Sequence, residues 1–224
     1  MHVTSYDNMS RFVAGHLGGY RGRHTTILDI GSQDVNGTYK PLFDDPLWHY
    51  SGADMAQGAN VDIVLKDVYN WREIPANSCD VVISGQALEH IEFPWMTMLE
   101  VERAMKPGGI CCIIAPSAGF EHRYPLDCFR FYRDGIRALA RYADLQIERA
   151  YTDVEPIDST GEPNLWYDTV LIATKPAAKP SLEKVRLVWR RTWSRWVLPP
   201  TADLSGTSVD PANPANPAET ADAS

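Results

Sequence analysis

The feature that most constrains the fold is a rhythm along residues 1–178, where short β-branched and apolar runs alternate with longer mixed segments. The runs predict seven strands, at Thr26–Ile30, His49–Ala53, Ile63–Leu65, Asp80–Ser84, Ile110–Ala115, Gln146–Ala150 and Tyr167–Ala173. Helices are predicted at Tyr39–Asp44, Trp95–Met105 and Arg133–Tyr142. Because strands joined through helices run parallel with right-handed crossovers, we expect an α/β protein with a doubly wound, mostly parallel sheet in a single domain.

Composition divides the 224 residues into three segments. Residues 1–178 form the predicted α/β domain. Residues 179–198 carry six bases and one acid and are rich in tryptophan, which predicts a basic amphipathic helix. Residues 199–224 hold five prolines, four acids and no aromatic residue, so we expect a disordered acidic tail that cannot bury enough apolar surface to order itself.

Charge and hydropathy exclude several classes of protein. The net charge of −8 argues against a general nucleic-acid-binding surface, which requires clustered Lys and Arg. No run approaches the roughly 18 consecutive apolar residues of a membrane span, and the first residues lack the layout of a secretion signal. The four cysteines have no CxxC spacing, which is typical of reduced thiols. We therefore expect a cytoplasmic protein.

The residues that follow each strand are the candidates for binding, because ligands of such sheets lie at the carboxyl ends of the strands. Asp29 and Gly31 close the first strand, Asp54 ends the second, 25 residues further on, and Asp67 follows the third. A carboxylate in the position of Asp54 can accept hydrogen bonds from both hydroxyls of a ribose; a solvated turn or helix cap is the alternative. The first turn lacks the GxGxxG of dehydrogenases, so a pyrophosphate-binding cofactor is not favoured.

Three sequence motifs occur in a characteristic order. Leu28-Asp29-Ile30-Gly31-Ser32 is similar to LDIGSGxG, and Cys79 through Ile91 is similar to FDxVxxxxxLEHI. Leu99 through Gly109 is similar to LxExxRxLKPGG. Over residues 26–117 the chain therefore resembles the class I S-adenosylmethionine-dependent methyltransferases, specifically their small type 11 branch. The resemblance implies a Rossmann-like sheet, an enzyme that transfers methyl groups, and S-adenosylmethionine as cofactor.

The resemblance also implies which residues bind the cofactor. Asp29 and Gly31 would hold the methionine end, Asp54 the ribose, and Asp67 with Val68 the adenine. Gln33 and Val35 depart from the family's glycines, so Gln33 must turn away from the cofactor or contact it. The complete set of implied cofactor-binding residues is Asp29, Gly31, Gln33, Asp54, Met55, Asp67, Val68, Gln86 and Ala87.

The acceptor side is predicted in the segment after the fifth strand, residues 116–132, which mixes His, Asp, Arg and aromatic residues. Rings that stack on C–H faces and charged groups that bind hydroxyls favour O-methylation of a sugar or glycoside. His122 is the expected general base with Asp127 as its orienter, and Glu89 and His90 are further catalytic candidates. The expected substrate-binding residues are Phe120, Arg123, Tyr124 and Arg130. A loop held together by Arg–Asp pairs and aromatic packing is the alternative.

A Mg²⁺ ion is a further expectation, with Asp127 and one of Asp153, Glu155, Asp158 or Glu162 as ligands. The DVNGTYK turn and the HRYPLDCFRFY loop look like those of small actinobacterial methyltransferases found with polysaccharide genes, such as those of methylmannose polysaccharide synthesis. This likeness favours an oligosaccharide acceptor. Alternatives are an N- or O-methyltransferase of another small metabolite, or a degenerate methyltransferase fold that binds a partner.

In residues 182–198, Leu182, Val185, Trp189, Trp193 and Trp196 form one helical stripe. We expect this stripe to pack on its own domain or across a homodimer, with arginine stems covering the rings. Peripheral contact with an anionic membrane is the alternative.

Overall fold

The structure, a computed structural model, describes residues 2–177 and 181–197, with the side chains of the last helix described from residue 185 onwards. A seven-stranded sheet runs through it in the order β3-β2-β1-β4-β5-β7-β6, and only β7 is antiparallel to its neighbours. The strands are β1 (Thr25–Ile30), β2 (Trp48–Asp54), β3 (Ile63–Val64), β4 (Cys79–Gly85), β5 (Met105–Pro116), β6 (Gln146–Thr152) and β7 (Asp168–Thr174). The predicted Rossmann-like, mostly parallel sheet is confirmed.

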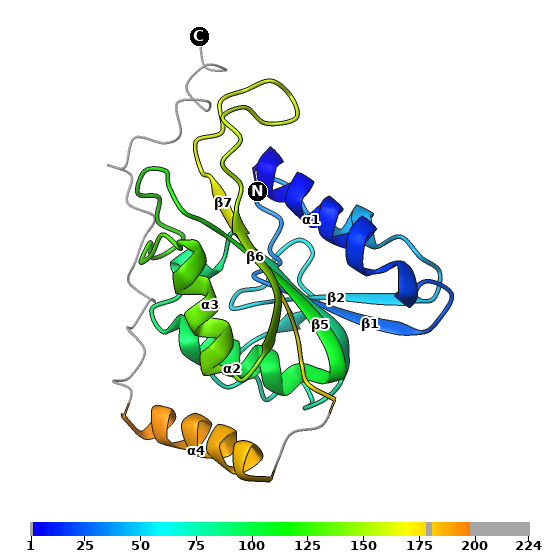
Figure 1. Cartoon of the computed structure of the whole chain (residues 1–224), viewed down its shortest axis with the longest axis vertical. Helices are drawn as coiled ribbons and strands as arrows, with labels where there is room; N and C mark the ends of the chain where they lie inside the picture. The colour runs from blue at the N-terminus through cyan, green and yellow to red at the C-terminus, as the bar shows by residue number, and fades with distance from the viewer. Residues whose placement is uncertain (1, 178–180, 198–224) are drawn as a thin grey trace.

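Helices cover both faces of the sheet. Helices α2 (Pro94–Ala104) and α3 (Arg133–Tyr142) lie on one face, and α1 (Val3–His16) lies on the other (Figure 1). The sequence did not predict α1, although Met9, Phe12 and Val13 give it a buried stripe, because its other residues are mostly polar or small. The helix predicted over residues 39–44 is instead a single 3₁₀ turn, Lys40–Phe43, because Pro41 and the short apolar run support only one turn.

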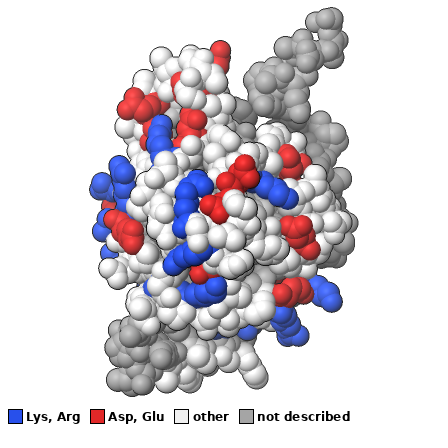
Figure 2. All heavy atoms as spheres, turned by 90° about the vertical axis from the view of Figure 1, so that its right-hand side faces the viewer, with Lys and Arg blue, Asp and Glu red and all other residues white. Residues whose placement is uncertain are grey.

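The core divides into two layers, because successive side chains of a strand point to opposite faces. Leu28 of β1 and Ile113 of β5 pack on the side of α2 and α3, whereas Ile27 and Ile114 pack on the side of α1. The cysteines are free thiols, and all but Cys128 are buried. On the face that Figure 2 presents, basic and acidic side chains are interspersed rather than gathered into one charged surface.

Helix α4 (Ser181–Val197) follows the sheet and lies beside α2 (Figure 1). Three of its arginines bind the domain: Arg190 binds Asp144, Arg191 binds Glu102, and Arg195 binds Glu100. None of the described helices is long and apolar enough to cross a membrane.

The opposite side of α4 carries its tryptophans. Trp189, Trp193 and Trp196 are 62%, 59% and 85% exposed, while Leu187 is buried. The expectation that the tryptophan stripe packs on its own domain is therefore wrong. The surface of the domain beside α4 carries carboxylates, and these bind the arginine side of the helix. A homodimer contact and a membrane contact stay predictions, and the predicted acidic tail, residues 199–224, lies outside the described residues.

We expect Glu102→Ala to destabilise the fold by about 3 kcal/mol. The Glu102 side chain is almost fully buried and pairs with both Lys175 and Arg191, so its removal leaves two cations at the junction of α2, α4 and the end of β7 without that carboxylate. Urea unfolding measures the change. The exposed Glu121→Ala is the control and should change the free energy of unfolding by less than about 0.5 kcal/mol; equal effects of the two variants would contradict the assignment.

Candidate functional site

The carboxyl ends of β1, β2, β4 and β5 meet at one edge of the sheet, and the loops that follow them form the candidate site. The loops after β1 and β4 touch at Gly31 and Ala87: a Cβ added to Gly31 would lie 2.4 Å from the Cβ of Ala87. Gly31 also has a φ of +72°, which favours glycine. Because Gly31 has no side chain, Gly31 and Ala87, two of the residues implied to bind the cofactor, can lie in contact.

Asp29 lies buried at the end of β1 and accepts a hydrogen bond from the hydroxyl of Tyr50 on β2. Burial raises the pKa of Asp29 to about 7, although the Tyr50 bond opposes the shift. The carboxyl can therefore change its charge near neutral pH, and a cationic ligand group beside it would favour the ionised form. Tyr50 was not anticipated from the sequence, since nothing in the sequence of β2 marks it apart from the neighbouring Trp48 and His49.

Asp54 at the end of β2 ties the first two loops together. One carboxylate oxygen accepts the backbone N–H of Gln33 at 3.1 Å, and the other accepts that of Met55 at 2.7 Å. The Gln33 side chain lies against Gly58 in the loop after β2, and Val35 is 64% exposed. The two residues that depart from the family's glycine pattern, Gln33 and Val35, are thus both exposed.

The residues that the resemblance places on the adenine side of the cofactor follow β3. The Asp67 carboxylate accepts the backbone N–H of Tyr69 at 2.9 Å, and Val68 is half-buried against the core. Met55 is 43% exposed, as a residue that covers a ligand from the solvent side would be in the free protein.

The side chain of Gln86, just after β4, forms hydrogen bonds with other residues of the protein. Its amide nitrogen donates to Asp168 at 2.8 Å and to Ser5 at 3.1 Å, and its amide oxygen lies 3.0 Å from the His2 ring. Asp168 also accepts the hydroxyl of Thr4. Gln86 therefore fixes the start of α1 over the edge of the sheet, a contact that sequence spacing could not reveal because it joins residues 82 positions apart.

On the acceptor side, the loop of residues 117–132 folds against the 3₁₀ turn Leu88–His90. The backbone N–H of Cys128 donates to the Glu89 carbonyl at 2.7 Å, and Nδ1 of His90 bonds to the Leu126 carbonyl. These bonds bring His122 beside Glu89 and His90, so that one ligand atom of each of the three lies within 4.8 Å of the others. Three of the four predicted catalytic residues therefore form one cluster.

Glu89 is the unusual member of this cluster. It is fully buried, and neither carboxylate oxygen has a hydrogen-bond partner in the described part of the chain. Burial raises the pKa of Glu89 to about 8 and lowers the pKa values of both His90 and His122. At neutral pH burial therefore favours the uncharged forms of all three, and Glu89 retains unused hydrogen-bonding capacity.

The fourth predicted catalytic residue, Asp127, is held by Arg130 through two hydrogen bonds of 2.6 and 2.9 Å. Burial opposes ionisation, but Arg130 and the backbone N–H of His122 hold the pKa of Asp127 below its usual range. Arg130 also donates to the Phe120 carbonyl. The Arg130 guanidinium thus stabilises the conformation of the loop, in agreement with the alternative of a loop held together by Arg–Asp pairs. Asp127 in turn positions the backbone of His122.

The wall beside the cluster is aromatic. The Trp166 ring lies 4.8 Å from that of His122 and 5.3 Å from that of Phe120, and it stacks on His2 at 4.3 Å. Gly119 lies under Trp166, where an added Cβ would be 2.3 Å from the ring. Trp166 and His2 were missed in the sequence because they come from the segment before β7 and from the N-terminus. Tyr124 and Arg123, predicted to bind substrate, lie in the exposed part of the loop.

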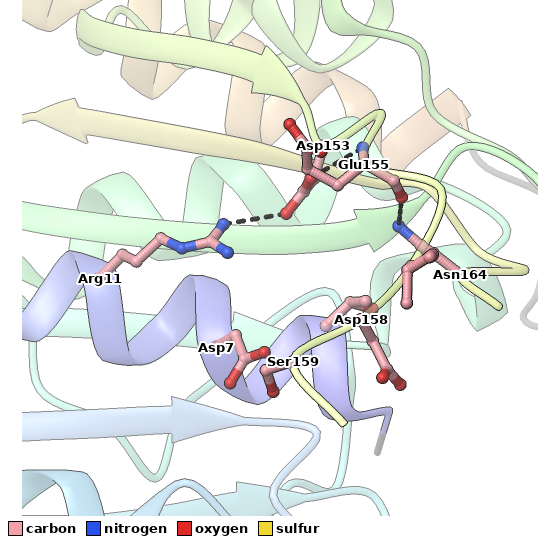
Figure 3. A pocket seen from close by; sticks show the side chains of 9 residues that line it. Asp7, Arg11, Asp153, Glu155, Asp158, Ser159 and Asn164 are labelled. Carbon is pink, nitrogen blue, oxygen red and sulfur yellow. Dashed lines mark hydrogen bonds and ion pairs between the residues drawn. The ribbon is translucent and has the colours of Figure 1, made fainter. Parts of the chain in front are cut away.

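The acidic residues predicted to bind Mg²⁺ with Asp127 belong to a different place. A cavity of about 180 Å³ lies between α1 and the loop of residues 153–164, lined by Asp7, Asp153, Glu155 and Asp158 (Figure 3). Asp153 is paired with Arg11 at 2.9 Å. Within the described residues, the one group of three or more candidate metal ligands is Glu89, His90 and His122. The expected magnesium ligand set is therefore not assembled.

Comparison with known proteins agrees with this arrangement. Residues 45–113 match the family described as "Methyltransferase domain". An uncharacterised methyltransferase of Mycobacterium avium is 28% identical over 145 residues, which cover 58% of this chain and 54% of the relative. The chain therefore spans about half the length of the curated relatives it matches.

Solved structures share the fold at low sequence identity. The 1,6-didemethyltoxoflavin-N1-methyltransferase of Burkholderia thailandensis, solved with its substrate and S-adenosylhomocysteine, has a TM-score of 0.58 at 15% identity, covering 77% of this chain and 78% of its own. The [4+2]-cyclase SpnF has a TM-score of 0.55 at 16% identity, covering 77% and 82%. Since a cyclase shares it, the fold by itself does not fix the reaction.

The family match and the curated relatives supply what the fold alone does not. Together with the order β3-β2-β1-β4-β5-β7-β6, they support a class I S-adenosylmethionine-dependent methyltransferase, the kind of protein that this chain is similar to over residues 45–113.

Proposed function

We propose that this protein transfers a methyl group from S-adenosylmethionine to a hydroxyl of a sugar or glycoside. The observation that carries the proposal is the cluster of Glu89, His90 and His122, which lies next to the cofactor loops and faces an aromatic wall. Ala87, which touches Gly31, is only two residues before Glu89. A methyl donor held by the first two loops would therefore be close to the groups that can take a proton from an acceptor.

Binding of the cofactor is assigned to the residues at the ends of β1 to β4. Asp29 holds the amino group of the methionine moiety, and Asp54, with Gln33 and Met55 beside it, holds the ribose. Asp67 and Val68 lie on the adenine side. Gln86 acts indirectly, since its side chain keeps α1 in place while Ala87 borders the methyl group.

In the reaction, the acceptor oxygen attacks the methyl carbon in line with the sulfonium. The new O–CH₃ bond forms as the S–CH₃ bond breaks, S-adenosylhomocysteine leaves, and the hydroxyl proton must be removed. His122 is the proposed proton acceptor, because burial favours its neutral form and Asp127 fixes its backbone. Glu89 and His90 complete the polar side of the site.

A sugar fits the character of the walls. Phe120, Trp166 and Tyr124 offer ring faces to C–H groups, while Arg123 and the cluster offer partners for hydroxyls. A large apolar acceptor would instead need an aliphatic pocket. Methylation of another small metabolite, on nitrogen or oxygen, and a catalytically silent domain that binds a partner are the competing functions. A cytoplasmic location and an oligosaccharide precursor as acceptor belong to this proposal.

We expect Asp54→Asn to weaken S-adenosylmethionine binding about 10- to 100-fold, because hydrogen bonds from the ribose to a charged acceptor are lost. Isothermal titration calorimetry measures the affinity. Asp134→Asn, which neutralises an exposed carboxylate on α3, is the control and should bind as the unaltered protein does. Equal affinity of both variants would remove Asp54 from the cofactor site.

Cofactor affinity should rise with pH through about 7. Burial raises the pKa of Asp29 to about 7, so the carboxyl is largely protonated at pH 6 and largely ionised at pH 8. The cationic amino group binds the ionised form better, and the gain should level off above pH 8. Asp29→Asn should bind weakly at pH 8 and lose this dependence. A flat profile in the unaltered protein would contradict contact between Asp29 and the cofactor.

Transfer of labelled methyl from S-adenosylmethionine to a panel of oligosaccharides, glycosides and lysate metabolites tests the function itself. We expect hydroxylated glycans to gain the label and His122→Ala to lower turnover about 100-fold or more with cofactor affinity kept. The neighbouring exposed Glu121→Gln should keep full turnover. Labelling confined to amines would replace the sugar assignment, and absence of cofactor binding would refute the enzyme.

A further inference from the structure

We propose that Glu89, His90 and His122 bind a divalent transition-metal ion, to which the acceptor hydroxyl coordinates during methyl transfer. This inference rests on the proposed function for the identity of the acceptor, but the metal site itself rests on the three side chains alone. It uses none of the acids around the cavity beside α1.

The spacing of the three side chains suits one ion. One donor atom of each lies within 4.8 Å of the others, and Nε2 of His90 is 3.7 Å from a Glu89 oxygen. Donors around a metal with bonds of about 2.0–2.2 Å lie roughly 3–4.3 Å apart. The cluster therefore needs only a small contraction to close on a cation.

The carboxylate of Glu89 supplies the independent reason for a ligand. It is fully buried, and both oxygens lack a partner in the described residues. Buried polar groups are normally hydrogen-bonded, because their desolvation is otherwise uncompensated. A cation at the cluster would satisfy these oxygens, whereas a direct proton transfer to His122 gives Glu89 no task.

Both histidines are oriented as metal-binding histidines usually are, with one ring nitrogen on a protein acceptor and the other free. Nδ1 of His90 faces the Leu126 carbonyl, which leaves its Nε2 beside Glu89. Nδ1 of His122 faces the Phe120 carbonyl at 3.3 Å and Asp127 at 3.5 Å, and also lies 3.4 Å from an Arg130 nitrogen. The tautomer with its proton on Nδ1 frees Nε2 as a ligand.

Charge around the cluster does not prevent a cation from binding. Arg130, the nearby base, has its charge balanced by both oxygens of Asp127. Two imidazoles and one carboxylate favour ions such as Zn²⁺, Mn²⁺ or Fe²⁺ over Mg²⁺, which prefers oxygen ligands alone. Three protein ligands leave coordination positions for the acceptor.

A bound cation would take over the task first assigned to His122. A cation held by these three side chains would lower the pKa of an acceptor hydroxyl beside it, so that the hydroxyl proton could pass to water. The O–CH₃ bond then forms as the S–CH₃ bond of the cofactor breaks, with no change of oxidation state. His122 acts as a neutral ligand in this form, and Trp166 beside it borders the acceptor.

Metal binding by the full chain tests the site without reference to activity. After removal of metals by chelation, one equivalent of Mn²⁺ or Zn²⁺ should bind, measured by calorimetry, and Co²⁺ should give visible absorption bands with nitrogen ligation. Glu89→Gln keeps the shape of the side chain and should weaken binding about 100-fold or more, given that even outer-shell changes cost 10- to 100-fold. The exposed Glu121→Gln should bind as the unaltered protein does.

Thermal unfolding guards against misfolding of the variant. The metal should raise the unfolding temperature of the unaltered protein and of Glu121→Gln, but not that of Glu89→Gln, while all three unfold alike without metal. Equal metal affinity of Glu89→Gln and the unaltered protein would overturn the site.

Turnover separates this inference from the proposed function. Methyl transfer that is lost on chelation and restored by Mn²⁺ or Zn²⁺ supports a catalytic metal. Full turnover in the chelated protein would overturn its role and leave His122 as the base. Metal binding with unchanged cofactor affinity, but no methylation of any hydroxyl compound, would refute the sugar acceptor and keep the site.

Discussion

The acceptor side of this protein depends on how the loop of residues 117–132 is attached to the turn after β4. Backbone carbonyls make the attachment. The Glu89 carbonyl accepts a hydrogen bond from the N–H of Cys128, and the Leu126 carbonyl is hydrogen-bonded to Nδ1 of His90. The Asp127–Arg130 pair then keeps the loop in the shape that these bonds require. His122 comes 33 residues after Glu89 in the sequence, so without this attachment nothing would hold it beside Glu89 and the cluster would not form.

The second constraint acts from the other side of the sheet edge. The start of α1 is bound through Thr4 and Ser5 to Asp168 and Gln86, so this end of the helix is fixed beside β4 and β7. His2 is thereby stacked on Trp166, and Trp166 in turn meets His122. The aromatic wall is thus assembled from three distant parts of the chain, and buried polar bonds at the start of α1 help to hold it.

The strands and the loops at their carboxyl ends could be predicted, because both signals are local. A short β-branched and apolar run marks a strand, and motifs such as Leu28 to Ser32 place their own residues at its end. The pairing of Tyr50 with Asp29 and of Gln86 with Asp168 could not be predicted, since each depends on the register between strands or on α1. The four catalytic candidates were predicted one by one, but the position of His122 beside Glu89 and His90 depends on the loop attachment.

Helix α4 shows the same limit. Its sequence has a tryptophan stripe and an arginine side, and hydrophobicity alone favours burial of the stripe. The domain instead presents Glu100, Glu102 and Asp144, and three arginines bind them. Carboxylates on α2 and after α3 therefore determine which side of α4 faces the domain. The sequence of the helix alone gives no information about these partners.

Two regions of the protein contain acidic side chains that could bind a ligand: the cavity beside α1 and the cluster around Glu89. Their unused hydrogen-bonding capacity distinguishes them. The acids near α1 are numerous, but Asp153 is paired with Arg11, and Asp158 receives the N–H groups of its own turn. Glu89 is a single carboxyl, yet it alone is fully buried with both oxygens unused in the described chain and with two imidazoles beside it. A ligand compensates desolvation only where desolvation has occurred. Unmet capacity under burial, and not the density of acids, therefore marks the place where this fold can hold a reacting group.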